Sequence, residues 1–232
     1  MSIHLTFVCA PGGDATLDPF LGDAPLSERC LRLAGAARAV LSPHQAAVRG
    51  PSIRCSQTAD AIGLAAVSEP MLRDLDVGRW YGRTVGEVAA TDPDGFSAWR
   101  TDPDAAPHGG ESVRQLCRRS ADWLRDVAPD AGHAVVVTEA AVVRAALVHA
   151  LAVPARTFWH LAVPPLCAVF LTRRGGCWDV QFGCVSPQES RRRFLARPAA
   201  LAAVDGERSA PAHLEGGHRP RTSPESILTG CG

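Results

Sequence analysis

Two short apolar segments far apart in the sequence most constrain what this chain can fold into. Ile3–Cys9 is an apolar run that ends at Pro11-Gly12-Gly13, which is typical of a buried strand followed by a loop. Ala134–Thr138 is nearly all β-branched, which is typical of a parallel strand buried on both faces. Helical patterns lie between the two segments, so the sequence predicts an α/β fold built around a central sheet.

Further helices and a hairpin complete the predicted architecture. Apolar residues recur at helical spacing in four segments, Leu26–Leu41, Gln57–Leu64, Ser112–Val127 and Ala140–Ala152. Ser27 suits the N-cap of the first of these helices. The apolar segments Leu166–Thr172 and Cys177–Phe182 are separated by Arg-Arg-Gly-Gly, which indicates a β-hairpin. We therefore expect a three-layer α/β sandwich, with helices flanking a mostly parallel central sheet and the hairpin at one edge.

The character of the sequence changes near residue 186. An Arg-Arg-Arg run at 191–193 leads into a stretch rich in Pro, Gly, Ser and Ala, and no periodic apolar pattern is present from residue 205 onward. We therefore predict a domain at 1–185, a helical extension at 186–204 and a disordered tail at 205–232.

Composition and charge argue against several classes of partner. The chain has 232 residues, 46% of them hydrophobic, which suits one α/β domain with a sizeable core. Its formal net charge is zero, so we expect no nucleic-acid partner, and no segment has the ~18 consecutive apolar residues of a membrane helix. The eight cysteines form no CxxC pair and the sequence shows no export signal, so we expect free thiols, no metal, no cofactor and a cytoplasmic location.

The candidate functional residues lie where strands end or loops begin, because chemistry in an open parallel sheet collects there. The two predicted strand ends and three intervening loops contribute one or two candidates each. They are Cys9, Ala10 and Glu139 at the strand ends, and Arg54, Asp74 and His108 in the loops.

Six sequence blocks occur in a fixed order along the chain. They are the strand end Val8-Cys9-Ala10, Ser52-Ile53-Arg54-Cys55-Ser56-Gln57-Thr58-Ala59, Leu72-Arg73-Asp74 with Gly78-Arg79-Trp80, Gly109-Gly110-Glu111-Ser112, Val137-Thr138-Glu139, and Trp159-His160-Leu161-Ala162-Val163-Pro164. In this order they resemble the histidine phosphatase, or phosphoglycerate-mutase-like, superfamily over about residues 3 to 182. The resemblance implies the same mostly parallel α/β sandwich that the apolar pattern predicts.

The resemblance also implies a role for each site position. In that family a histidine attacks phosphorus, two arginines and a second histidine hold the phosphoryl oxygens, and an acidic residue protonates the leaving group. Carried over to this sequence, the nucleophile position is Ala10, the arginine positions are Cys9 and Arg54, the acid position is Asp74, and the second histidine position is Glu139.

Three of these residues depart from the roles that the resemblance implies. Ala10 has no lone pair with which to attack phosphorus, and Cys9 removes one positive charge. Glu139 adds a carboxylate, so a phosphate dianion would face Arg54 together with Asp74 and Glu139. One misplaced unit charge at ~4 Å costs on the order of 4 kcal/mol at an effective dielectric constant of ~20. We therefore predict that phosphohistidine chemistry is lost.

Three functions stay open at this point. The first is a pseudophosphatase that binds a ligand and is no conventional phosphatase. The second is an enzyme in which Asp74 and Glu139 act as acid and base, for example an isomerase, dehydratase, cyclase or non-phosphate hydrolase, with Arg54 anchoring an anionic group. The third is a weak phosphomonoesterase that uses water activated by Glu139. The expected partner is a small molecule, with an anion as one option, and the oligomeric state is left open.

Several candidate residues also have a purely structural interpretation. Cys9 is either a ligand contact or a small buried hydrophobic residue, and His108 is either a ligand contact or a solvated loop histidine. Glu139 could instead form an ion pair with Arg54. Arg144, on the helix after Glu139, is interpreted as a surface arginine.

Overall fold

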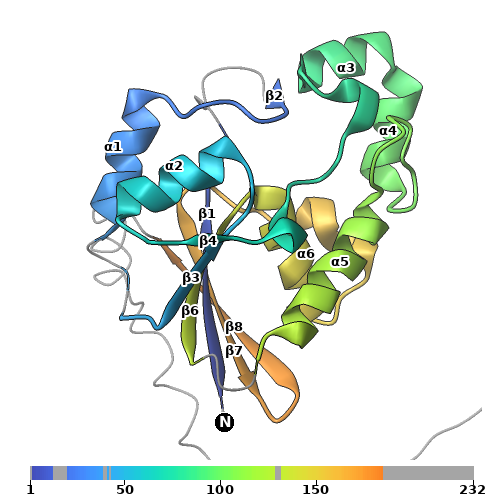
Figure 1. The fold of residues 1–232 in the computed structure, drawn as a ribbon. Coiled ribbons are helices and arrows are strands. Elements are labelled where there is room, and N and C mark those ends of the chain that lie inside the picture. Colours follow the sequence, from blue (N-terminus) through green and yellow to red (C-terminus); the bar gives the residue numbers. More distant parts are fainter. Residues whose placement is uncertain (1, 13–19, 39–40, 42, 129–131, 185–232) are drawn as a thin grey trace, which may run out of the picture. The chain divides into compact units, whose positions relative to one another are not determined.

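The computed structural model describes residues 2–12, 20–38, 41, 43–128 and 132–184. The domain predicted at 1–185 is thus described up to residue 184, and the predicted extension at 186–204 and tail at 205–232 lie outside the described residues. The main element of the described part is a six-stranded sheet with the strand order β4-β3-β6-β1-β7-β8 (Figure 1).

Four parallel strands form one side of this sheet. β1 (Ile3–Cys9) pairs with β6 (His133–Thr138), which pairs in turn with β3 (Ala46–Arg49), and β4 (Val67–Ser68) forms the edge. Cys9 lies opposite Thr138 in the register of β1 and β6, so both strands end at the same level. The residues that follow them, which the sequence marks as site candidates, are therefore neighbours at one edge of the sheet.

The other side of the sheet is antiparallel. β7 (Cys167–Arg174) runs antiparallel to β1 and forms a hairpin with β8 (Cys177–Cys184), joined by Gly175 and Gly176. Both glycines have positive φ, at 55° and 88°, which glycine adopts without steric cost. The predicted α/β fold with a mostly parallel sheet and an edge hairpin is confirmed.

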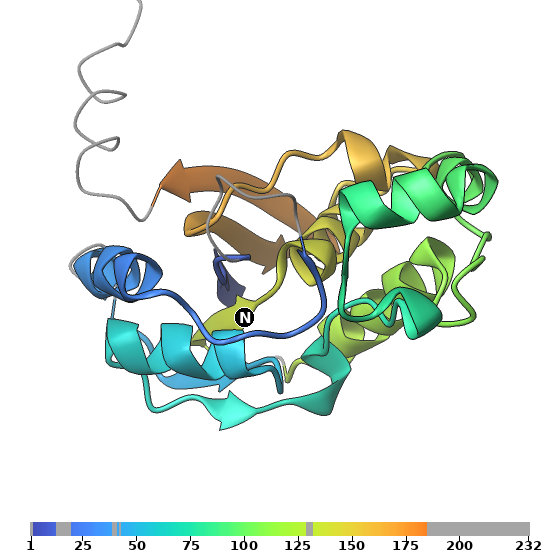
Figure 2. The same cartoon turned by 90° about the horizontal axis from the view of Figure 1, so that it is seen from above.

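Helices cover both faces of the sheet. α1 (Glu28–Ala37) and α2 (Ile53–Ile62) lie on one face, and α5 (Val113–Asp126) and α6 (Ala140–Ala150) lie on the other (Figure 2). Side chains alternate along β1 and therefore join two separate cores. Val8 and Ala10 pack with the core of α1 and α2, whereas Leu5, Phe7 and Cys9 pack with that of α5 and α6.

Hydroxyl caps explain where three of these helices begin. Ser27, Ser52 and Ser112 each accept a hydrogen bond from the backbone N–H of the third residue that follows, which satisfies one of the free donors of a first helical turn. The predicted cap at Ser27 is confirmed. Ser112 forms a full capping box, since the Gln115 side chain also accepts from the Ser112 backbone.

A small subdomain, formed mostly by the chain between α2 and α5, was not predicted from periodicity. It contains the ribbon of β2 (Phe20–Leu21) and β5 (Arg83–Thr84), the helices α3 (Val85–Thr91) and α4 (Pro93–Thr101), and the short 3-10 turns η2 (Pro70–Leu72) and η3 (Gly78–Trp80). A further 3-10 turn, η4 (Ala155–His160), follows α6. Among the described residues, no helix is long and apolar enough to cross a membrane.

Candidate active site

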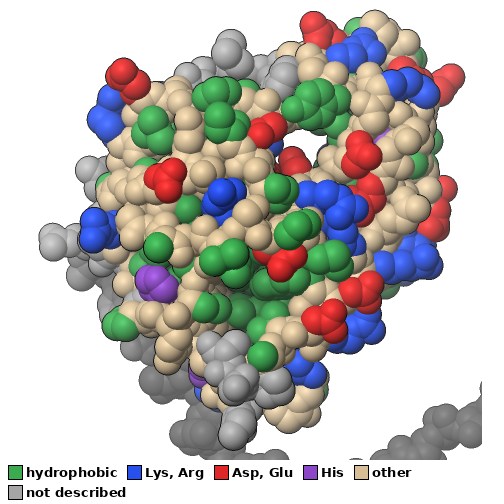
Figure 3. Space-filling view, viewed as in Figure 1, with side chains coloured by type: hydrophobic (Ala, Val, Ile, Leu, Met, Phe, Trp, Pro, Cys, Tyr) green, Lys and Arg blue, Asp and Glu red, His purple; other side chains and the backbone are tan. Residues whose placement is uncertain are grey.

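A cavity of about 590 Å³ opens at the ends of β1 and β6. Its lining brings together five of the six sequence-predicted residues, namely Cys9, Ala10, Arg54, Asp74 and Glu139. Figure 3 shows the surface hollowed between the α1–α2 side and the α3–α4 side of the molecule, with hydrophobic and acidic side chains at the rim of the hollow. The residues predicted at the strand ends therefore line one cavity with Arg54 and Asp74, and their roles stay predictions.

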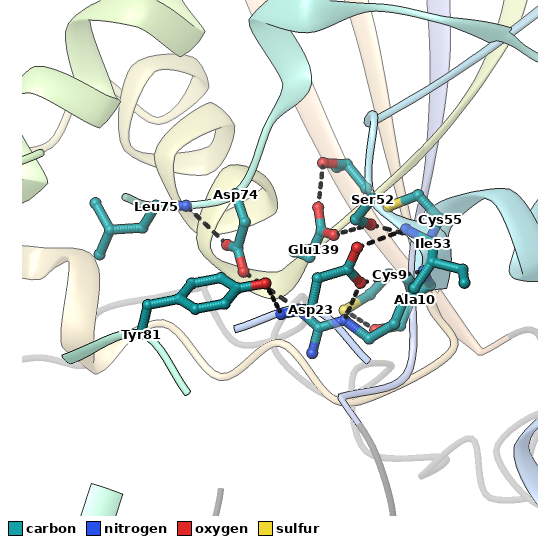
Figure 4. Close-up of polar contacts among 12 residues, drawn as sticks. Cys9, Ala10, Asp23, Ser52, Ile53, Cys55, Asp74, Leu75, Tyr81 and Glu139 are labelled. Atoms are coloured by element: carbon teal, nitrogen blue, oxygen red, sulfur yellow. Dashed lines mark hydrogen bonds and ion pairs between the residues drawn. The ribbon is translucent and has the colours of Figure 1, made fainter. Parts of the chain in front are cut away.

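Glu139 is the most enclosed acidic group of this pocket, with 4% of its surface exposed. It is the N-cap residue of α6, where the helix dipole favours a negative charge, but its side chain makes no capping bond. The Ser52 hydroxyl donates a short hydrogen bond to Glu139 Oε1, and Glu139 Oε2 lies 3.4 Å from Thr138 Oγ1 (Figure 4). One carboxylate oxygen is thus fixed from a neighbouring helix.

The wall behind Glu139 leaves space for a carboxylate because Gly50 lacks a side chain. A Cβ at Gly50 would lie 3.3 Å from Glu139 Oε2 and 2.8 Å from the Leu72 carbonyl oxygen. The Cys55 thiol lies on the same side, and burial, followed by the charge of Glu139, raises its pKa far above the usual range. Cys55 is therefore a neutral thiol that packs beside the carboxylate.

Asp74 is the second acidic group, and its side chain keeps 37% of its surface open. Enclosure by the surrounding protein, followed by the charge of Glu139, raises the pKa of Asp74 to about 7, while Arg54 opposes the rise. The Leu75 backbone N–H donates to Asp74 Oδ1 at 2.9 Å. A carboxyl group with a pKa in this range suits proton transfer near neutral pH.

Arg119, which the sequence did not single out, holds the segment that carries Asp74. Its buried guanidinium donates to the carbonyl oxygens of Met71 at 2.6 Å and Arg73 at 3.0 Å. It also forms a two-point contact with Glu111, at 2.9 and 2.7 Å. Glu111 belongs to the Gly-Gly-Glu-Ser block of the sequence, so that block supports the position of Asp74 indirectly.

Arg54 has two acidic neighbours, and Glu139 is not one of them. Arg54 Nη2 lies 3.4 Å from Asp74 Oδ2, and Arg54 Nε lies 3.7 Å from Asp23 Oδ1. The expected ion pair between Arg54 and Glu139 is not among the ion pairs of the described residues. Asp23 was missed because it acts from a distant loop, where it accepts from the Ile53 backbone N–H at 2.7 Å.

Cys9 and Ala10 point to opposite faces of the sheet, as strand alternation predicts. Cys9 is 1% exposed, and a hydrogen bond with Cys167, followed by burial, raises the pKa of its thiol well above the usual range. It is therefore a neutral thiol, which is a weak nucleophile. A contact between Cys9 and a ligand stays a prediction.

His108 is not among the residues that line the cavity. It is 2% exposed and packs edge-on against Trp80 and Trp99, at ring separations of 5.0 and 6.1 Å. Its Nδ1 accepts from the Gly110 backbone N–H at 3.0 Å, and burial lowers its pKa. His108 is thus neither a solvated loop histidine nor placed in the pocket, and its ligand contact stays a prediction.

Two further arginines line the pocket, of which Arg100 was not predicted and Arg144 was interpreted as a surface residue. Arg144, which the sequence suggested to be a surface residue, is half-buried and lines the cavity together with Arg100. No sequence signal could have placed them there, since both positions depend on how α4 and α6 pack. Among the described residues, no group of three or more His, Cys, Asp and Glu side chains could hold a metal ion.

Residues 20–183 match the sequence model of the histidine phosphatase superfamily (branch 1), which is well over half of the chain. The chain therefore belongs to the histidine phosphatase superfamily, and the resemblance of its sequence blocks is confirmed. The loss of phosphohistidine chemistry, which depends on matching Ala10 and Glu139 to histidine positions, stays a prediction.

Individual proteins of this superfamily match parts of the chain. A bifunctional protein of Mycobacterium tuberculosis is 34% identical over 105 residues, which cover 42% of this chain and 29% of that protein. The adenosylcobalamin/alpha-ribazole phosphatase of Salmonella typhimurium is 27% identical over 135 residues, which cover 56% of this chain and 62% of that protein. The chain thus matches less than two thirds of the length of either relative.

Solved structures confirm the fold. A mycobacterial glucosyl-3-phosphoglycerate phosphatase in complex with VO3 superposes with a TM-score of 0.69 at 24% identity. The superposition covers 77% of this chain and 97% of that structure, so nearly the whole phosphatase fold is present here.

Proposed function

We propose that this protein is an enzyme that uses Asp74 and Glu139 for general acid–base catalysis on a small molecule bound in the cavity. The observation that carries the proposal is the pair of carboxyl groups, Asp74 and Glu139, that line one cavity, and enclosure together with Glu139 raises the pKa of Asp74 to about 7. A carboxyl group that titrates near the working pH, in a cleft and beside a second carboxyl, has the properties of a general acid.

The two carboxyl groups suit different tasks. Asp74 is partly open to the cavity and carries the raised pKa, so it donates a proton to the substrate. Glu139 is enclosed and oriented by Ser52, so it accepts a proton from the substrate or from water. Reactions that need one donor and one acceptor in this way include isomerisation, dehydration, cyclisation and hydrolysis of a non-phosphate bond.

The related proteins favour an active enzyme over a pseudophosphatase, because several of them are named as phosphatases. They also favour a second candidate function, a phosphomonoesterase. In this chain such a reaction would use water activated by Glu139, since Ala10 offers no nucleophile at the end of β1. The pocket's carboxyl groups repel a phosphate, which ranks this candidate second.

Two assays test the proposal. One follows turnover of p-nitrophenyl phosphate and of p-nitrophenyl carboxylic esters, and the other uses NMR in deuterated water to detect exchange at carbon in a panel of small carboxylated and phosphorylated metabolites. We expect wild-type activity on at least one non-phosphate compound and its loss in Glu139→Gln and Asp74→Asn. Asp94→Asn, an exposed carboxyl on α4, is the matched control and should retain activity.

Three results distinguish the candidates. Turnover restricted to phosphomonoesters and dependent on Glu139 would favour the second function. Activity that survives in both carboxyl variants, or no activity on any compound, would overturn the acid–base proposal. The double variant Ala10→His, Glu139→His tests whether the strand ends can support a phosphohistidine, which would appear as an acid-labile phosphoprotein.

A further inference from the structure

The acidic residues of the pocket leave two of its arginines without a carboxylate partner. Arg54 is flanked by Asp23 and Asp74, at 3.7 and 3.4 Å, so its charge is already balanced. Arg100 and Arg144 also line the cavity, and neither forms an ion pair within 4.0 Å among the described residues. The positive charge available to a ligand is therefore that of Arg100 and Arg144.

Among the described residues, the guanidinium of Arg144 forms a hydrogen bond through only one of its nitrogen atoms. Its Nε donates to the Leu161 carbonyl oxygen at 2.9 Å, which fixes the direction of the side chain. The remaining N–H groups make no hydrogen bond among the described residues, although the side chain is half-buried. Burial lowers the pKa of Arg144, and the nearby charge of Arg100 lowers it further. Both guanidinium groups lie near the Trp159 ring, at 4.4 and 5.9 Å from its centroid, and an anion bound beside them would favour the charged form of Arg144.

Aromatic side chains surround this pair of cations. The Arg100 guanidinium lies 4.4 Å above the Trp159 ring, and Trp159 packs edge-on against Trp99 at 4.5 Å. Phe96 extends this surface, and it lines the cavity together with both tryptophans. Such a wall binds a flat apolar body by contact with the ring faces and edges.

The two arginines and the two carboxyl groups come from different positions along the chain. Arg144 lies five residues after Glu139 along α6, which corresponds to about 7.5 Å of helix rise and about 140° of rotation. Arg100 comes from the end of α4, in the subdomain above the sheet (Figure 1). An anionic group bound there would lie beside the reacting atoms and would not be the group that reacts.

We propose that Arg100 and Arg144 form an anion-binding subsite that selects substrates with an aromatic body and a carboxylate or phosphate at one end. The claim that such molecules are substrates rests on the proposed function. Their binding to Arg100 and Arg144 can be tested without turnover. The shared chemistry is an anionic group with an aromatic ring next to it, and the headgroup is left for the experiment to identify.

Isothermal titration calorimetry with phenylacetate and phenyl phosphate, and with benzyl alcohol as the uncharged counterpart, tests the subsite. We expect at least one of the two anions to bind about tenfold or more tightly than benzyl alcohol, since hydrogen bonds to charged groups contribute roughly tenfold or more in affinity. Arg100→Gln and Arg144→Gln should each weaken the anion about tenfold and leave benzyl alcohol unchanged. Arg118→Gln, an exposed arginine on α5, should change neither.

Arg144→Lys keeps the positive charge, so it should retain anion binding even if Arg144→Gln fails to fold. Arg100 is exposed, so its replacement should not disturb folding. The tighter of the two anions identifies the headgroup. The inference is overturned if neither anion binds saturably, or if the double variant Arg100→Gln, Arg144→Gln binds them as tightly as the wild type does. Asp74→Asn should still bind the anion, so loss of turnover and loss of binding report separately on the proposed function and on this subsite.

Discussion

The hydrogen bond from Ser52 to Glu139 gives the sharpest test of how the pocket is built. The Ser52 hydroxyl accepts from the Cys55 backbone N–H at 3.1 Å and donates to Glu139 Oε1. Ser52→Ala removes both bonds at once. The lost helix cap costs about 1 kcal/mol, and the lost bond to a largely buried carboxyl costs about 1.5–3 kcal/mol. The free energy of unfolding should therefore fall by about 2.5–4 kcal/mol.

Ser112→Ala is the matched control, because Ser112 is also an N-cap serine and accepts from the Gln115 backbone N–H at 3.2 Å. Ser112 has no buried carboxyl as an acceptor among its described hydrogen bonds, so its replacement should cost only about 1 kcal/mol. Urea unfolding followed by tryptophan fluorescence measures both variants. If the two losses agree to within about 0.5 kcal/mol, the bond to Glu139 contributes nothing and the argument for an oriented carboxylate fails. Repeating Ser52→Ala in a Glu139→Ala background should reduce its cost to that of the cap alone.

Three further predictions follow from the same structure. Because Asp74 donates its proton with a pKa of about 7, wild-type activity should fall as the pH rises above 7 in a pH–rate profile, and an NMR titration of the Asp74 carboxyl in Glu139→Gln should show a lower pKa, since the charge that raises it is removed. Gly78→Ala should lower the melting temperature clearly more than Gly82→Ala. Both glycines have positive φ, but a Cβ at Gly78 would lie 2.3 Å from the His108 carbonyl oxygen, whereas a Cβ at Gly82 would have nothing within 4 Å. Iodoacetamide at pH 8 should label the exposed Cys177 in the native protein, and should label the buried Cys9 and Cys55 only after unfolding. Mass spectrometry of the peptides measures the labelling, and equal labelling of all three in the native protein would contradict the burial.

The parts of the fold that were predictable are those with a strong local pattern. β1 and β6 are strands of seven and six residues, most of them apolar, and the hairpin of β7 and β8 has a glycine pair at its turn. β3 and β4 have only four and two residues, which is too short for alternation to identify them. α3 could have been found from its capping box, since Thr84 and Glu87 have the required spacing.

The candidate site was predictable wherever a residue followed a strand or belonged to a sequence block. Glu139 and Asp74 were found in this way, and the cavity contains both. Asp23 was not found, because its function depends on contact with a helix that starts 30 residues later. Arg144 was assigned to the surface because helical spacing alone does not show which neighbour covers a side chain.

Asp23 changes how the charges of the pocket are interpreted. From sequence, Arg54 was the anchor for an anion and faced Asp74 and Glu139. In the structure Asp23 and Asp74 take up that charge, and the cations open to a ligand come from α4 and α6. The proposed ligand, which is anionic at one end and reacts at the other, fits a pocket that offers both unpaired cations and carboxyl groups.

The environment of Glu139 argues for a retained site. A buried carboxylate without partners is strongly destabilising, so a decaying pocket would be expected to lose it to a neutral residue. Here Ser52 donates to the carboxylate, Gly50 leaves room for it, and the neutral Cys55 packs beside it. Ser52 and Cys55 belong to α2 and its N-cap, and Gly50 follows β3. All three lie around the side chain of Glu139, which lines the cavity. A carboxylate supported in this way beside a cavity fits the proposed role of Glu139 as a proton acceptor.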